Sequence, residues 1–400
     1  MTWFFRCSAC GATYDLGPDR YLCDACSTTQ APERPLAGVL EAEWEGEAEG
    51  LPLPVEPEWF PPIPVGGTPL WRPARLRREL GFPELYLKDD TANPTGSYKD
   101  RASILVAAFA AKWGIREIAL ASTGNAASSM AAVGAAAGIA VTVFLPATAP
   151  AAKRIQVLQY GASLHLVDGS YDVAYEQSLE YTRDGRAMSR NTAYNPLTIE
   201  GKKTAAFEIV DQLAAAAAKE RGGAAMGSGG SALPPDHLFV PVGDGVILSG
   251  LYRGFENLLQ LGRIRKMPTI WACQAEGSSA IARALETGSF SAPVRSSTIA
   301  DSIAVDVPRN GEHALSKLRR YRGKAVCVSD EEILLAQRRL ASTTGLFAEP
   351  SSSAAFAGFL KVRDSLDRSA RIVLLITGSG LKDPESAARG LAATPASRTE

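Results

Sequence analysis

Short apolar runs alternate with longer amphipathic or alanine-rich segments along most of the chain. The short runs favour strands and the longer segments favour helices. Because the runs are almost continuously apolar, they are typical of parallel strands buried on both faces. Strands are predicted at residues 84–88, 117–121, 140–145, 163–167, 238–242, 269–274, 325–328 and 371–376, and helices at residues 99–113, 124–137, 150–160, 171–183, 203–221, 249–262, 278–287, 330–344, 351–366 and 383–391. This order predicts an α/β fold with parallel sheets flanked by helices.

Two stretches lack this alternation. Residues 31–65 are acidic at first and then rich in proline, so we expect an extended linker there. Residues 222–235 are rich in glycine, alanine and serine and are predicted to form an exposed loop. The predicted organisation is a small unit over residues 1–30, the linker, and a large domain over residues 66–395.

A lysine follows a proline and glycine turn in the run Asn-Pro-Thr-Gly-Ser-Tyr-Lys-Asp-Arg at residues 93–101. Pro94 and Gly96 shape the turn, and an apolar helical run follows. Lys99 therefore stands at the start of a helix, where the dipole makes an amine easier to deprotonate. A neutral amine is the form that attacks carbonyl groups to give Schiff bases. The alternative is a solvated lysine in a loop.

Three further segments run from an apolar strand into a loop. Residues 118–125 end in Ser-Thr-Gly-Asn, residues 239–250 contain Gly-Asp-Gly, and residues 372–383 place Thr377 directly after a strand. Loops at helix starts present backbone N–H groups to anions. Ligands also collect at the carboxyl ends of parallel strands. Each loop alone is equally compatible with an ordinary strand-to-helix turn.

Taken together and in this order, the segments resemble the threonine synthase branch of the fold-type II enzymes that use pyridoxal 5′-phosphate (PLP). Matches at residues 194–213 and 328–353 extend the resemblance to roughly residues 66–390. The resemblance implies a two-lobed fold with the cofactor between the lobes and a smaller, mobile lobe at about residues 101–205. It also implies a small amino-acid substrate and a homodimer.

The resemblance gives each segment a role. Lys99 is expected to hold PLP as a Schiff base and then to act as the general base for the Cα proton. Asn125 is expected to bond the cofactor 3′-oxygen, and Thr377 to face the pyridine nitrogen. The expected substrate-carboxylate residues are Ser122, Thr123 and Gly124, and the expected phosphate cup consists of Gly243, Asp244, Gly245, Val246 and Ile247.

Four positions depart from the family pattern. Two of them are Asp244 and Val246, where phosphate cups of the family often carry an asparagine or a further glycine. Thr198 stands where many threonine synthases have an arginine that would suit the phosphate of O-phosphohomoserine, and Ser379 replaces a histidine. Asp244 puts a carboxylate beside a phosphate, so we expect it to bond the backbone or a helix partner instead. The basic residues that could replace the missing arginine are Lys153, Arg154, Arg190, Lys202 and Lys203, each of which can also be interpreted as a surface charge.

Three functions are compatible with these residues. The first is threonine synthase: γ-elimination of phosphate from O-phospho-L-homoserine, then β-addition of water. The second is β-elimination or β-replacement on serine, threonine, O-phosphoserine or diaminopropionate, which Thr198 and Ser379 favour. The third is a non-catalytic binding protein of the same fold, which the intact Lys99 disfavours.

Four cysteines near the N-terminus form two Cys-x-x-Cys pairs, Cys7 with Cys10 and Cys23 with Cys26, with 12 residues between the pairs. This spacing predicts a tetrahedral four-thiolate zinc site in a small ribbon. The zinc would be structural, because four thiolates leave no open position. The alternative is a pair of disulfides, which a cytoplasmic location disfavours.

Charge and hydropathy exclude several classes of partner. The net charge is −1, from 42 basic and 43 acidic residues that are interspersed. We therefore expect no binding to nucleic acid or to an anionic membrane. No apolar run approaches the roughly 20 residues of a membrane span, and the apolar start of the chain is too short for a signal peptide. The predicted location is the cytoplasm.

Overall fold

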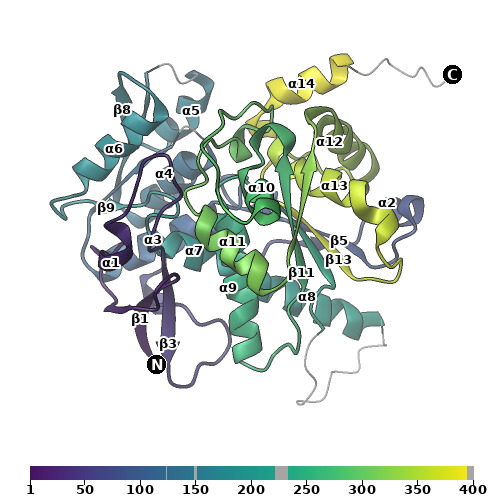
Figure 1. The fold of residues 1–400 in the computed structure, drawn as a ribbon, viewed down its shortest axis with the longest axis horizontal. Coiled ribbons are helices and arrows are strands. Elements are labelled where there is room, and N and C mark those ends of the chain that lie inside the picture. The colour runs from purple at the N-terminus through teal and green to yellow at the C-terminus, as the bar shows by residue number, and fades with distance from the viewer. Residues whose placement is uncertain (123, 148–150, 221–232, 394–400) are drawn as a thin grey trace.

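Three β-sheets organise the residues that the computed structural model describes, which are 1–122, 124–147, 151–220 and 233–393 (Figure 1). In spatial order, the largest sheet contains β12 (Lys324–Val328), β11 (Thr269–Ala275), β10 (His237–Pro241), β13 (Ile372–Ile376), β5 (Leu85–Asp89) and β4 (Leu70–Trp71). The second contains β8 (Ser163–Val167), β7 (Ala140–Pro146), β6 (Glu117–Ala121) and β9 (Met188–Ser189). The N-terminal sheet contains β2 (Thr13–Asp15), β1 (Thr2–Cys7) and β3 (Leu40–Glu45).

The two larger sheets are parallel, except that β4 pairs antiparallel with β5. The prediction of an α/β fold with parallel sheets and flanking helices is confirmed. Every predicted strand overlaps an observed one, whereas the short strands β4 and β9 and the N-terminal sheet were not expected. Two-residue strands and half-exposed antiparallel strands carry too little apolar sequence to stand out.

Helices connect and cover these strands. They are α1 (Asp24–Ser27), α2 (Ala74–Leu80), α3 (Asp100–Lys112), α4 (Asn125–Ala137), α5 (Ala151–Gln159), α6 (Tyr171–Tyr181), α7 (Leu197–Glu200), α8 (Thr204–Glu220), α9 (Val246–Gln260), α10 (Ala280–Thr287), α11 (Gly311–Arg320), α12 (Asp330–Thr344), α13 (Pro350–Val362) and α14 (Pro384–Ala393). None of the helices in these described ranges is long and apolar enough to cross a bilayer. Most of the predicted loop at residues 222–235 lies outside the described residues.

The largest sheet is buried on both faces, which explains its continuous apolar strands. In β10, Phe239 packs with Phe356 and Phe359 of α13 on one face. Leu238 and Val240 pack in a second core with residues of α8 and α9 on the other face. Successive strand residues point to opposite faces, so every position of such a strand must be apolar.

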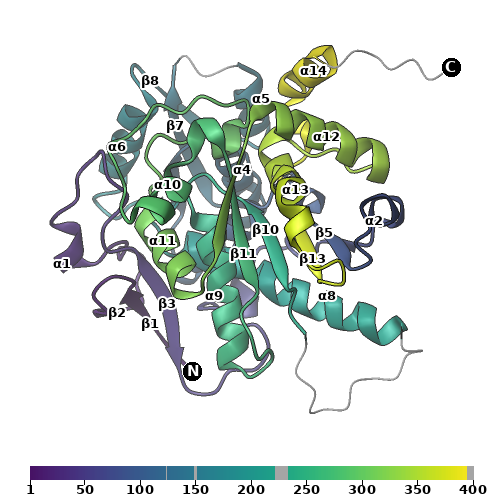
Figure 2. The same ribbon diagram turned by 45° about the vertical axis from the view of Figure 1, so that its right-hand side comes forward.

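The second sheet forms a separate layer with α3, α4 and α6, on the left of Figure 1, while α12 and α13 flank the largest sheet on the right of Figure 2. The strands of the second sheet come from residues 117–189, which lie inside the range predicted for the smaller lobe. The mobility of that lobe stays a prediction. The N-terminal sheet lies below α7 and to the left of α9 in Figure 1, and its strand β3 contacts α7.

The prediction of a linker over residues 31–65 is wrong for β3. This strand pairs with the whole length of β1, and its Leu40 and Ala42 are fully buried. The acidic residues that suggested a linker alternate with apolar ones, which is the period of a half-buried strand. The prediction of a linker followed from the acidic composition and not from this alternation. The small N-terminal unit is therefore residues 1–45, called the N-terminal ribbon below.

Candidate active site

One cavity brings together residues from distant segments of the chain. It lies where β10 and β13 end and where α3, α4 and α9 begin. Its lining includes Lys99, Asn125, residues 243–247 and Thr377, all of which the sequence singled out. The fold therefore gathers the predicted cofactor residues at one place, at the carboxyl ends of parallel strands.

Lys99 is held by the turn that precedes α3. The backbone N–H and the hydroxyl of Thr95 both donate to the carboxylate of Asp100, at 2.8 and 2.5 Å. The N–H of Tyr98 donates to the carbonyl of Thr377 at 2.8 Å. The turn is thus tied both to the first residue of α3 and to the chain that leaves β13.

The surroundings of Lys99 favour its neutral amine. Burial lowers the pKa of Lys99, and the positive charge of Arg190 lowers it further. The negative charges of Asp244 and Glu349 act in the opposite direction without reversing the net shift. A lowered pKa increases the fraction of neutral amine near neutral pH, which is the form that acts as a nucleophile or base.

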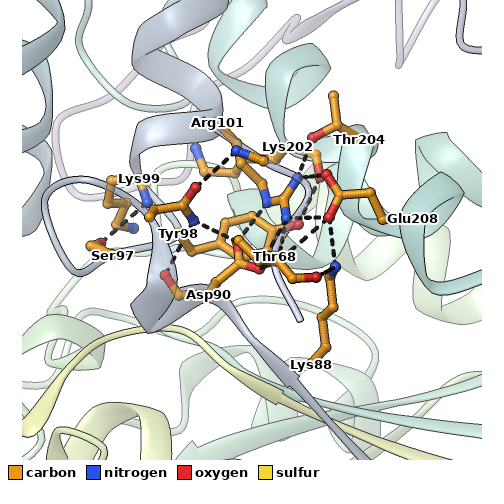
Figure 3. Close-up of polar contacts among 12 residues, drawn as sticks. Thr68, Lys88, Asp90, Ser97, Tyr98, Lys99, Arg101, Lys202, Thr204 and Glu208 are labelled. Carbon is orange, nitrogen blue, oxygen red and sulfur yellow. Dashed lines mark hydrogen bonds and ion pairs between the residues drawn. The ribbon is translucent and has the colours of Figure 1, made fainter. Parts of the chain in front are cut away.

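A buried network of charged side chains anchors α3 directly after Lys99 (Figure 3). Arg101 donates to Asp90 at 2.5 Å and to Glu208 at 2.6 Å, and Glu208 also accepts from Lys88 at 2.5 Å. Arg101, Asp90 and Lys88 are at most 1% exposed. No sequence pattern indicates this network, because its members lie up to 120 residues apart.

Residues 243–247 form a tight turn into α9. A Cβ on Gly243 would lie 2.7 Å from the Cα of Ile303. Gly245 has a φ of +88°, and its Cβ would lie 2.7 Å from the Cβ of Ala314. The turn leads into the first turn of α9, whose N–H groups have no partner inside the helix. A glycine turn that delivers free N–H groups at a helix start fits a phosphate group.

The carboxylate of Asp244 is engaged by a neighbouring loop. It accepts the backbone N–H of Arg309 at 2.7 Å, while the backbone carbonyl of Asp244 accepts the N–H of Asn310 at 3.1 Å. Burial raises the pKa of Asp244. The expectation that Asp244 bonds the backbone is confirmed.

The other predicted residues occupy the expected elements. Thr377 follows β13 and is 6% exposed. Asn125 begins α4, and its amide donates to the carboxylate of Glu349 at 3.1 and 3.2 Å. Its bond to a cofactor oxygen therefore stays a prediction.

The loop before Asn125 is described except at one position. The hydroxyl of Ser122 accepts the N–H of Gly124 at 3.2 Å. Thr123 lies outside the described residues. The role of this loop in binding a substrate carboxylate stays a prediction.

The cavity also contains a buried carboxylate that was not predicted, that of Glu349. Glu349 is 4% exposed and contacts Ser302 at 3.4 Å as well as Asn125. Burial raises the pKa of Glu349. Glu349 begins the run Glu-Pro-Ser at residues 349–351, which lies within the matching range 328–353. A carboxylate at the start of an apolar helix is the sequence signal that could have predicted Glu349 as a site residue.

The basic residues proposed to replace the missing arginine fall into two groups. The surface interpretation is wrong for Arg190, Lys202 and Lys203, which are fully buried. Lys203 pairs with Glu200, so its charge is already compensated. Arg154 donates to the carbonyl of Ala147 at 2.6 Å, and the side chain of Lys153 lies outside the described residues.

Arg190 and Lys202 are buried near enough to Lys99 for their charges to affect its titration or be affected by it, but neither is among the residues that line the cavity. Arg190 donates to the hydroxyl of Ser103 at 3.4 Å, one helical turn after Lys99. The side chain of Lys202 donates to the carbonyl of Thr198 at 2.8 Å, and its own carbonyl accepts the hydroxyl of Tyr98. Within the described ranges, neither cation forms an ion pair with a carboxylate. Burial lowers the pKa of both, well below its ordinary value for Lys202 and to about 10 for Arg190. A bound anion would raise both pKa values again and so favour the charged forms.

Thr198 and Ser379, which also depart from the family pattern, form hydrogen bonds within the protein. The hydroxyl of Thr198 donates to the carbonyl of Asn195 at 2.7 Å and accepts the N–H of Ala193 at 3.2 Å. The hydroxyl of Ser379 accepts the N–H of Leu381 at 3.3 Å. Thr198 thus has no free donor for a substrate.

The four N-terminal cysteines converge. Their sulfur atoms lie within 4.8 Å of one another, with separations of 3.9 Å for Cys7 and Cys26 and 3.6 Å for Cys10 and Cys23. Tetrahedral zinc with Zn–S bonds of about 2.3 Å places its sulfurs about 3.8 Å apart. The cysteine set therefore fits a four-thiolate metal site, and all four thiols are free of disulfides.

Comparison with known proteins defines the class of protein to which this fold and cavity belong. Residues 63–378 match the model of the family described as pyridoxal-phosphate dependent enzyme, so the chain belongs to that family. The protein is a PLP-dependent lyase related to threonine synthases. It is 34% identical to the threonine synthase of Methanocaldococcus jannaschii, with 96% of this chain and 94% of the relative covered.

Further relatives agree. The threonine synthase of Mycobacterium tuberculosis strain H37Rv is 34% identical, with 90% of this chain and 93% of the relative covered. Among solved structures, the processed form of threonine deaminase isoform 2 from Solanum lycopersicum matches with a TM-score of 0.66 and 19% identity, covering 87% of this chain and 98% of that one. Maize serine racemase matches with a TM-score of 0.65 and 21% identity, covering 81% and 92%. These structures share the fold.

Proposed function

We propose that the protein converts O-phospho-L-homoserine and water to L-threonine and inorganic phosphate. The observation that carries this proposal is the pair of buried cations, Arg190 and Lys202, near Lys99. A buried charge without a counter-ion is costly, so such cations favour an anionic ligand. The substrate phosphate is a second anion in addition to the cofactor phosphate, and it requires a second cationic site.

In this proposal, separate sets of residues bind the cofactor phosphate, the substrate carboxylate and the substrate phosphate. The N–H groups of residues 243–247 hold the cofactor phosphate at the start of α9. The loop at Ser122 and Gly124 receives the substrate carboxylate, while Arg190 and Lys202 receive the substrate phosphate as charge-assisted hydrogen-bond donors. PLP, when bound, supplies the electron sink that stabilises charge at the substrate carbon atoms.

Lys99 then handles the protons of the reaction. The pKa of its amine is lowered, and Lys99 lies at the start of α3. The neutral amine can therefore take a proton from the substrate Cα and return one later. The network around Arg101 keeps α3, and with it Lys99, in a fixed place (Figure 3). Placement within a few tenths of an ångström matters for proton transfer.

A second function is favoured by Thr198. Its hydroxyl donates to a backbone carbonyl, so Thr198 has no donor left for a substrate phosphate. This favours the alternative of β-elimination or β-replacement on serine, threonine, O-phosphoserine or diaminopropionate. Of these substrates, serine, threonine and diaminopropionate carry no phosphate and so require no second phosphate site.

The deciding experiment measures threonine and phosphate release from O-phospho-L-homoserine by PLP-loaded protein. We expect both products in equal amounts, and none from Lys99→Ala. Absence of both products from wild-type protein whose absorbance shows lysine-bound cofactor would refute the threonine synthase assignment. The same assay with serine and O-phosphoserine then tests the alternative.

We also propose that Cys7, Cys10, Cys23 and Cys26 bind a structural Zn²⁺. The fit of the sulfur positions to tetrahedral geometry supports this metal. A ribbon with so small a core depends on such a site for stability. Metal analysis of the purified protein should find one zinc per chain, and a metal-free protein would refute the proposal. A homodimer remains the expectation from the family resemblance.

A further inference from the structure

We propose that the N-terminal ribbon braces the phosphate-binding turn, so that metal binding at the four cysteines controls how tightly the protein holds the phosphate of PLP. This inference rests on the zinc site and the cofactor site proposed above. Two consecutive contacts connect the cysteines to residues 243–247, and a third contact joins Arg309 to Pro32 and to α6. None of the three involves the substrate.

The first contact joins the cysteines to residues 36–39. The N–H of Cys23 donates to the carbonyl of Gly38 at 2.9 Å, and a Cβ on Gly38 would lie 2.8 Å from the Cβ of Cys23. Ser8, next to Cys7, donates its N–H and its hydroxyl to the carbonyl of Val39 at 3.0 and 2.8 Å. The segment therefore lies directly on both cysteine turns and depends on their shape.

The second contact joins that segment to the turn. The buried side chains of Leu36 and Val39 pack in one apolar cluster with Val246, the first residue of α9. The N–H of Leu36 also donates to the carbonyl of Arg309 at 2.8 Å. The N–H of the same Arg309 donates to the carboxylate of Asp244 at 2.7 Å. Both ends of the turn are thus supported from the ribbon side.

The third contact is the side chain of Arg309, which joins the ribbon side to the second sheet. It donates to the carbonyl of Pro32 at 3.1 Å and to the carboxylate of Asp172 in α6 at 3.0 Å. It also lies 5.2 Å from the ring centre of Tyr175. Arg309 is therefore a positioning residue for the turn, since it acts on the turn through Asp244 and does not line the cavity.

This arrangement has a specific consequence for affinity. A phosphate bound by backbone N–H groups senses the position of the backbone, and no flexible side chain can compensate when the turn shifts. Release of the metal frees the cysteine turns and, through residues 36–39, removes support from Val246 and Asp244. Pyridoxal lacks the phosphate, so its binding at Lys99 does not depend on this support.

The test uses the full-length protein, before and after removal of its metal with a chelator, titrated with PLP and with pyridoxal and followed by absorbance. Metal removal should weaken PLP binding about tenfold, equivalent to about 1.4 kcal/mol, and change pyridoxal binding by less than about twofold. Equal weakening of both ligands, or no change in PLP binding, would overturn the inference. A purified protein without metal would overturn it as well.

Two variants remove contacts between the N-terminal ribbon and the turn at residues 243–247 while leaving the cysteines intact. Leu36→Ala removes packing on Val246, and Arg309→Ala removes the side-chain contacts but keeps the backbone bonds. Each should weaken PLP binding by about threefold to tenfold with unchanged metal content and unchanged pyridoxal binding. Arg186→Ala is the matched control, because Arg186 pairs with Asp184 at the surface and is 88% exposed.

The outcomes separate this inference from the proposals on which it rests. Untreated wild-type protein that binds neither PLP nor pyridoxal would refute the cofactor site itself. Wild-type protein that binds both ligands, and whose variants retain full PLP affinity, would overturn only the brace. Rescue of PLP affinity when zinc is returned to stripped protein would support the inference.

Discussion

The residues around Lys99 fall into two sets that are built in different ways. The set at residues 243–247 uses backbone N–H groups and glycines from one contiguous turn. The other set uses the buried side chains of Arg190, Lys202 and Glu349, which come from distant segments. A group that stays the same throughout the reaction, such as the cofactor phosphate, can be bound by the backbone N–H groups of a single turn. The phosphorylated substrate that we propose would require charged side chains, which only the folded chain assembles.

The largest expected effect tests the backbone set. Gly243→Ala places a Cβ 2.7 Å from the Cα of Ile303, so the turn must shift. We expect PLP affinity to fall at least about a hundredfold, equivalent to about 2.7 kcal/mol, measured by titration. Pyridoxal binding and the far-ultraviolet circular dichroism should stay close to wild type. Unchanged PLP affinity would show that the turn does not bind the phosphate.

The next effect tests the side-chain set. Arg190→Met and Lys202→Met each remove one buried cation, and a charged hydrogen bond contributes about 1.5–3 kcal/mol. The value of kcat/KM for O-phospho-L-homoserine should therefore fall about tenfold to a hundredfold. PLP affinity should change little.

Two controls sharpen this second prediction. Arg186→Met changes an exposed arginine of the same lobe and should leave kcat/KM unchanged. Turnover of unphosphorylated serine, where it is detectable, should not fall in the Arg190 and Lys202 variants. An equal loss on phosphorylated and unphosphorylated substrates would contradict a phosphate-binding role.

The smallest effect concerns Glu349. Burial raises its pKa, so the folded protein holds this proton more tightly than the unfolded chain. Its contribution to the free energy of unfolding is therefore complete below the ordinary pKa of 4.5 and is lost as pH rises through the raised pKa. Glu349→Gln cannot ionise and should lack this loss.

Urea unfolding of both proteins at a series of pH values checks this prediction. The stability of the variant relative to wild type should increase from about pH 4.5 upward. Parallel stability curves for the two proteins would contradict it. Asp244 also has a raised pKa, but it is present in both proteins and cancels in the comparison.

Features that lie within one stretch of chain were predictable. The parallel strands, the lysine turn, the glycine turn and the cysteine pairs all have local patterns, and the structure places the corresponding residues at one cavity or one sulfur cluster. The strand β3 was missed although it is local, because its acidic residues suggested a linker. Its Glu41 is in fact buried against His313 and Lys317.

Features that depend on distant partners were not predictable. Whether Arg190, Lys202 and Lys203 are surface charges or buried cations depends on what covers them, and Lys203 differs from the other two only because Glu200 lies beside it. The charge network at Arg101 and the cavity position of Glu349 likewise arise from contacts between separate elements.

The amino-acid sequence by itself determined the order of strands and helices, the position of Lys99 at the start of α3, the glycine turn before α9 and the two cysteine pairs. Each depends on backbone conformation and hydrophobic period, which neighbouring residues set. Only the tertiary structure decided which charges are buried and unpaired, and what the N-terminal ribbon touches. Burial and electrostatic pairing are properties of surroundings, and residues far apart in the chain supply them.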